Sequence, residues 1–152
     1  MIVSFCGHRH IFDNKNELKT KVMDILDKYS DIKDLVFLCG AYGDFDKIGY
    51  ACACKIKEKN PDAKIVLVTP YYDSLYIANK KELYPLVDEV YYPNLESVPK
   101  KYCILERNKY IIDESDLVIC YVRRRIGSGA YQMIDYARKK KKRIENLYVF
   151  NC

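Results

Sequence analysis

The chain has 152 residues, of which 49% are hydrophobic and 31% are charged. This composition is typical of a globular chain and excludes a disordered or fibrous one, and the length predicts a single domain over residues 1–152. No apolar run approaches the roughly 18 residues of a membrane span, and no basic segment followed by an apolar stretch opens the chain. We therefore expect a cytoplasmic protein with no membrane partner.

The charge distribution and the cysteines indicate which partners and which redox state to expect. The formal net charge is +5, and residues 138–143 supply six consecutive cations. Without this run the acidic and basic residues nearly balance, so we expect no domain-wide nucleic-acid surface and no nucleic-acid partner, while a local basic patch remains open. We interpret the run as the end of a helix, where cations complement the helix dipole. The seven cysteines are odd in number and show no C-x-x-C spacing, so we expect reduced thiols.

Short apolar segments alternate along the chain with segments of helical periodicity, and this pattern predicts the fold. The predicted strands cover residues 2–6, 35–39, 64–69, 89–92, 117–121 and 147–150. Helices are predicted after an N-cap at Asn14, after the glycines near residue 40, after a cap at Ser97, and from 129 to about 141. This alternation predicts an α/β fold, a Rossmann-like, doubly wound, mostly parallel sheet of about six strands with helices on both faces.

Glycines follow three of the predicted strands, in segments 7–9, 40–43 and 127–129. Glycine between a strand and a helix lets backbone N–H groups approach an anion, and the helix N-terminus favours negative charge. Three such junctions should converge, so we expect strand 2–6 to lie between strands 35–39 and 117–121. Arg9, Arg107 and the arginines at 123–125 can bind phosphate, and the Tyr42 ring can stack on a base. Alternatively, Gly7 makes a tight turn before a solvated loop.

Arg107 and Asn108 fall in or beside the apolar stripe of a predicted helix that also carries Ile104 and Ile111. Burying a guanidinium and an amide without partners is costly, so a polar feature must lie under this helix. We expect both residues to face the carboxyl ends of the strands as the floor of a pocket. We also expect Arg107→Ala to weaken ligand binding while the fold stays intact.

Six motifs together resemble the SLOG superfamily, which joins DNA-processing protein A and the Lonely Guy proteins, and the YpsA-like branch is the nearest. They are Gly7-His-Arg9, Gly40-Ala-Tyr-Gly-Asp-Phe-Asp46, Leu67-Val-Thr-Pro70, Glu106-Arg-Asn108, Ser115-Asp-Leu-Val-Ile119 and Gly127-Ser-Gly129. The resemblance implies a Rossmann-like fold that binds a nucleotide-derived small molecule. The expected ligand-binding residues are Gly7, His8, Arg9, Gly40, Ala41, Tyr42, Gly43, Asp46, Thr69, Pro70, Arg107, Asn108, Gly127, Ser128 and Gly129.

The chain departs from the Lonely Guy pattern at one position. Those enzymes cleave the bond between base and ribose of nucleoside monophosphates with an arginine and a glutamate, the latter within P-G-G-x-G-T-x-x-E. Arg107 matches the arginine, but Met133 stands where the glutamate would lie. Asp135 would project about 200° around the helix from Met133 and is a poor substitute.

Two hypotheses remain open from the sequence. The first is binding or sensing of a nucleotide derivative without turnover. The second is an N-glycosidase-type hydrolase in which Arg107 acts with Glu106 or Asp46. A metal site at Cys6, His8 and His10 would lack a fourth ligand, so we expect neither a metal nor a cofactor. The sequence leaves open whether the chain forms a homo-oligomer.

Overall fold

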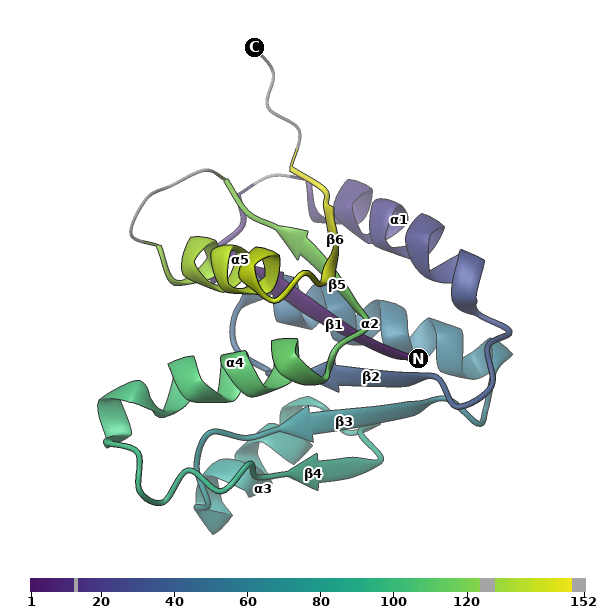
Figure 1. Ribbon diagram of the computed structural model, residues 1–152. Coiled ribbons are helices and arrows are strands. Elements are labelled where there is room, and N and C mark those ends of the chain that lie inside the picture. Colours follow the sequence, from purple (N-terminus) through teal and green to yellow (C-terminus); the bar gives the residue numbers. More distant parts are fainter. Residues whose placement is uncertain (13, 124–127, 149–152) are drawn as a thin grey trace.

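The computed structural model describes residues 1–12, 14–123 and 128–148, which contain one sheet of parallel strands (Figure 1). Its order is β4-β3-β2-β1-β5-β6. The strands are β1 (Ile2–Gly7), β2 (Val36–Cys39), β3 (Lys64–Val68), β4 (Glu89–Tyr91), β5 (Leu117–Tyr121) and β6 (Arg143–Asn146). The predicted fold class is confirmed, and so is the position of β1 between β2 and β5.

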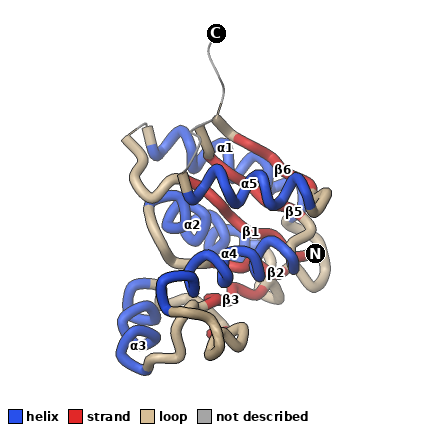
Figure 2. Tube along the Cα trace, turned by 60° about the vertical axis from the view of Figure 1, so that its left-hand side comes forward, coloured by secondary structure: helices blue, strands red, loops and turns tan. Residues whose placement is uncertain are grey.

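Helices cover both faces of this sheet (Figures 1 and 2). The helices α1 (Lys15–Leu26) and α2 (Asp44–Lys59) lie on one face, and α4 (Cys103–Glu114) and α5 (Gly129–Lys139) lie on the other. The helix α3 (Ser74–Leu83) lies near the β3–β4 edge, and short 3-10 turns form at Asp27–Tyr29 and Lys100–Tyr102. Strands β2 to β4 extend from β1 in one direction and β5 and β6 in the other. The strand order therefore reverses between β1 and β5, where ligands bind in such sheets.

Successive side chains of β1 point to opposite faces of the sheet and so pack under different helices. Val3 and Phe5 pack in the large core under α1 and α2. Ser4 and Cys6 point to the opposite face, where Cys6 packs against Ile112 of α4. The face under α4 and α5 therefore receives small and weakly polar side chains from the central strand.

Two predicted helix starts have different outcomes. The Asn14 cap is confirmed, because its Oδ1 accepts hydrogen bonds from the backbone N–H groups of Asn16 at 3.0 Å and Glu17 at 3.2 Å. The Ser97 cap is wrong, because Pro99 is extended with ψ 138° and the following 3-10 turn leads into α4 only at Cys103. An extended residue after Ser97 interrupts any helix that would begin there.

At residues 147 and 148, the described part of the predicted last strand 147–150, the prediction is also wrong. The structure forms β6 at Arg143–Asn146, paired in parallel with residues 117–120 of β5. The turn after α5, in which Lys141 has φ 56°, returns the chain to the edge of β5 four residues earlier than the apolar pattern indicates. Backbone pairing forms β6 although three of its four residues are polar, and only Ile144 packs against the core. Residues 149 and 150 lie outside the described residues.

The 138–143 run therefore covers the end of α5, its turn and the start of β6. The cysteines at 6, 39, 52, 54, 103 and 120 are free thiols. Within the described part of the chain, no helix is both long and apolar enough to cross a membrane.

Candidate functional site

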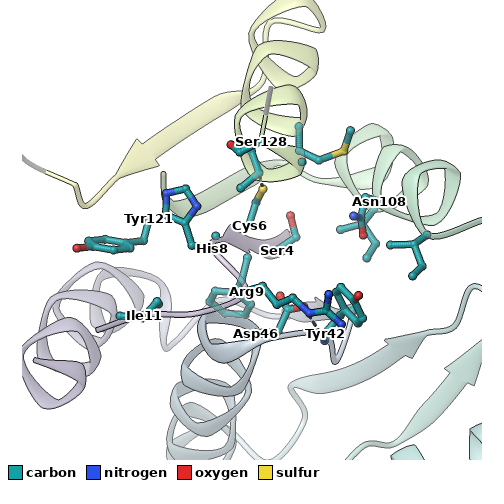
Figure 3. Close-up of a pocket in the computed structure, with 18 of the residues that line it drawn as sticks. Ser4, Cys6, His8, Arg9, Ile11, Tyr42, Asp46, Asn108, Tyr121 and Ser128 are labelled. Atoms are coloured by element: carbon teal, nitrogen blue, oxygen red, sulfur yellow. Dashed lines mark hydrogen bonds between the residues drawn. The ribbon is translucent and has the colours of Figure 1, made fainter. Parts of the chain in front are cut away.

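A cavity of about 520 Å³ opens beside the carboxyl ends of β1 and β5, where the strand order reverses. Segments far apart in sequence meet there: the loop after β1, the β2–α2 junction, one side of α4 and the start of α5 (Figure 3). The predicted site residues that line it are Gly7, His8, Arg9, Gly40, Tyr42, Asp46, Arg107, Asn108, Ser128 and Gly129.

Gly7 at the end of β1 is required by helix packing. A Cβ on Gly7 would lie 2.5 Å from both Cβ and Cγ of Phe45 in α2. The absence of a side chain thus lets α2 lie against the sheet, whereas the sequence suggested close approach to an anion. This packing positions the first turn of α2 beside the cavity.

His8 connects the loops that follow the two central strands. Its backbone N–H donates to the carbonyl of Tyr121 at 3.3 Å, and its Nε2 accepts the backbone N–H of Arg123 at 2.8 Å. With Nε2 accepting, a neutral imidazole carries its proton on Nδ1. His8, which lines the cavity, therefore links the loops after β1 and β5.

Arg9 and Tyr42 form a stacked pair at the cavity (Figure 3). The guanidinium carbon of Arg9 lies 4.3 Å from the centroid of the Tyr42 ring, a cation–π distance. The Arg9 carbonyl also accepts the Asp44 N–H at 2.9 Å, which fixes the loop to the start of α2. The structure thus places an arginine over the ring that the sequence suggested for base stacking.

Asp46, in the first turn of α2, is the single carboxylate among the described residues that line the cavity. Its Oδ2 accepts the Tyr42 N–H at 2.8 Å. Burial raises the pKa of this carboxyl to about 6, although the nearby Arg107 charge and the Tyr42 hydrogen bond act in the opposite direction. Strongly shifted pKa values in a cavity are typical of functional sites.

Arg107 is 1% exposed and is held by the protein's own acceptors. Its Nη1 donates to the carbonyls of Gly40 at 2.8 Å and Val68 at 3.0 Å, at the ends of β2 and β3. Its Nε donates to Oδ1 of Asn108 at 2.8 Å. The predicted polar feature under α4 is therefore the pair of strand-end carbonyls. Because Arg107 makes these three hydrogen bonds within the protein, we expect Arg107→Ala to destabilise the fold, in contrast to the expectation from the sequence.

The start of α5 is the second helix terminus at the cavity. Ser128 caps it, since Oγ accepts the Tyr131 N–H at 3.1 Å. The first turn of α5 carries no acidic side chain, whereas the first turn of α2 carries Asp44 and Asp46. Of these two helix N-termini, that of α5 is the better site for an anion, because its first turn carries no negative charge. The arginines at 124 and 125 and Gly127, also expected here, lie outside the described residues.

Five candidate residues lie away from the cavity lining. Glu106 pairs with Lys109 at 3.3 Å, so Asp46 is the one candidate catalytic acid that lines the cavity. Thr69 lines a separate cavity of about 380 Å³ near β4. The other three are Ala41, whose carbonyl accepts the Lys80 ammonium at 2.8 Å, Gly43, which precedes α2, and the buried Pro70.

Sequence reasoning missed the apolar wall of the cavity. Ile104, Ile112 and Met133 line it between α4 and α5. The signal was present for α4, because Ile104 and Ile112 lie four residues before and after Asn108 and so share its side of the helix. Met133 of α5 is 3% exposed. Ser4 was also missed, although it alternates with Val3 and Phe5.

Among the described residues, no group of three or more histidine, cysteine, aspartate or glutamate side chains could hold a metal ion. No protein-family model matches the chain, and no curated protein does either. The likeness to the SLOG superfamily rests on the six sequence motifs.

Proposed function

We propose that this domain binds a nucleotide or a nucleotide-derived small molecule, without turnover, in the cavity at the ends of β1 and β5. The observation that carries the proposal is a cavity at the point where the strand order reverses, whose lining includes two arginines, a helix N-terminus and an apolar wall. The SLOG-like motifs support the same ligand class.

The cationic part of the lining suits phosphate. Arg9 and Arg123 line the cavity, and α5 begins at it behind the Ser128 cap. Arginine binds phosphate oxygens through paired N–H groups, and a helix N-terminus adds backbone donors. The first turn of α5 carries no acidic side chain that would repel a phosphate there.

The apolar wall suits a flat ring. Ile104, Ile112 and Met133 supply aliphatic and thioether surface, and Asn108 lies among them. A base placed there would bury its faces against these side chains while one edge remains available for hydrogen bonding. A ligand with a charged end and a ring end would match both the arginines and the apolar wall of this lining.

The residues at the cavity support binding over turnover. In the Lonely Guy comparison, Met133 occupies the position of the catalytic glutamate, and its thioether cannot exchange a proton. Asp135 does not line the cavity and pairs with Lys139 at 3.1 Å. The carboxylate expected for cleavage of the base–ribose bond thus has no counterpart on α5.

One observation favours a hydrolase as the second candidate. Asp46 lines the cavity with a pKa of about 6. A carboxyl with this pKa exchanges its proton near neutral pH and can act as a general acid or base. In that case Asp46 would replace the missing glutamate.

Thermal unfolding with a panel of nucleoside monophosphates, cyclic dinucleotides and ADP-ribose tests binding, because a ligand of the folded state raises the melting temperature. We expect at least one compound to raise it, and Arg9→Ala to reduce the effect. Arg138→Ala, at the far end of α5, serves as the matched control. If no compound raises the melting temperature, the binding proposal is wrong.

Incubation with the same monophosphates, followed by chromatography for free base, tests the second candidate. We expect no free base from the wild type. Release of base that Asp46→Asn abolishes would instead establish the hydrolase.

A further inference from the structure

The orientation of the Asn108 amide is fixed by its neighbour in the sequence. The Arg107 Nε can only donate, so the 2.8 Å contact identifies the atom facing it as the amide oxygen of Asn108. Arg107 itself is buried and is anchored at Nη1 by the carbonyls of Gly40 and Val68. Asn108 therefore cannot exchange its oxygen and nitrogen without losing a hydrogen bond to a buried cation.

The amide nitrogen of Asn108 is consequently left for the cavity. Asn108 is half-buried on the α4 wall (Figure 3), and its Nδ2 donates to no protein group in the described part of the chain. The neighbouring wall is apolar, from Ile104 and Ile112 on α4 and Met133 on α5. A donor in such surroundings gains most from a ligand acceptor, because the wall supplies none.

We propose that Asn108 selects the base of the bound nucleotide, favouring a base that presents a carbonyl oxygen over one that presents an amino group at the same position. This inference rests on the proposed nucleotide binding and specifies the ligand further. The apolar wall holds the ring, and the Asn108 N–H group donates to the carbonyl at its edge.

The hydrogen bond from Arg107 to the amide oxygen of Asn108 decides which kind of base is preferred. An asparagine with a free oxygen and nitrogen reads adenine through both atoms, accepting from the amino group and donating to a ring nitrogen. Here the oxygen is turned toward the buried Arg107 guanidinium, so the amide atom left for the cavity is the Nδ2 donor. An amino group placed opposite Nδ2 would face this donor with a second donor. A keto group in its place would accept.

Inosine 5′-monophosphate and adenosine 5′-monophosphate form the matched pair of probes, because the first carries a carbonyl and a ring N–H where the second carries an amino group and a ring nitrogen. Isothermal titration of the wild type with each should give tighter binding of the inosine compound, by about tenfold, the scale of one hydrogen bond gained or lost. Both probes carry the same phosphate and ribose, so the ratio of their affinities isolates the base.

The variant Asn108→Asp reverses the chemistry at this position. Its carboxylate still accepts from the Arg107 Nε, but it presents an acceptor to the cavity in place of the donor. We expect the inosine-to-adenosine affinity ratio to fall by about tenfold or more. Asn79→Asp introduces the same charge at an exposed position of α3 and should leave the ratio unchanged. A purely structural role for Asn108 would weaken both probes by one common factor.

The outcomes separate the two proposals. If the wild type binds both probes equally, or prefers adenosine 5′-monophosphate, the role of Asn108 in selectivity is overturned while nucleotide binding stands. If the wild type binds neither probe nor any other nucleotide of the panel, both proposals are wrong. The wild-type comparison decides the question even if Asn108→Asp fails to fold.

Discussion

Asp46 and Arg107 both reach the space beside Gly40: a Cβ on Gly40 would lie 3.3 Å from Oδ2 of Asp46 and 3.3 Å from Cζ of Arg107. A carboxyl from α2 and a guanidinium from α4 thus approach the end of β2 because the residue there has no side chain. The raised pKa of Asp46 near this cation shows that burial outweighs the attraction between the two groups.

The first prediction concerns Gly40→Ala. The added methyl group must displace Asp46 or Arg107 by a few tenths of an ångström, so we expect a loss of about 1–3 kcal/mol in the free energy of unfolding, measured by urea denaturation. Gly129→Ala is the control, since a Cβ there meets no atom within 4 Å. Equal stability of the two variants would mean that Asp46 and Arg107 are held loosely.

The second prediction is a pH dependence caused by Asp46. Its pKa in the folded protein, about 6, lies above the usual 3.8, so the folded state keeps the proton to higher pH than the unfolded state does. This carboxyl therefore lowers stability as pH rises from about 4 to about 6, and its cost stays constant above that range.

Asp46→Asn removes this titration. Its stability relative to the wild type should improve by on the order of 2–3 kcal/mol between pH 4 and pH 7, as measured by urea denaturation at each pH. Asp135→Asn provides the comparison, because the Asp135 side chain on α5 is about half exposed. A difference between Asp46→Asn and the wild type that stays constant with pH would contradict the raised pKa.

The third prediction is that Arg107→Met destabilises the protein by about 3–5 kcal/mol. Methionine fills part of the volume, but the carbonyls of Gly40 and Val68 lose their donor, and a buried unsatisfied group costs about 1–3 kcal/mol. Arg138→Met, at the end of α5, should change stability by less than about 0.5 kcal/mol. An unchanged melting temperature in Arg107→Met would show that Arg107 serves the ligand alone.

The fourth prediction distinguishes the packing role of Gly7 from an anion-binding role. Gly7→Ala would place its Cβ 2.5 Å from Phe45, so α2 must move away from β1. We expect a larger loss of stability than in Gly40→Ala, and the loss should be present without any ligand. A variant that folds as stably as the wild type but fails to bind phosphate compounds would support the anion-binding role instead.

The sequence by itself determined the fold class and the edge of the sheet at which the cavity lies. Apolar periods and glycine junctions are local signals, and in a doubly wound sheet they suffice to bring residues 7, 40 and 129 to one side. The same reasoning required polar partners under α4 for Arg107 and Asn108. It was wrong about β6, because backbone pairing with β5 forms that strand without an apolar pattern.

Only the tertiary structure decided what each polar group contacts. The 2.8 Å bond from Arg123 to His8 spans 115 positions, and the bond from Arg107 to Gly40 spans 67. Such contacts depend on how helices pack on the sheet, which local periodicity does not encode. The same packing keeps Glu106 out of the cavity, brings Met133 into it, and leaves the nitrogen of Asn108 on the cavity side of α4, because each helix presents only one side to the sheet.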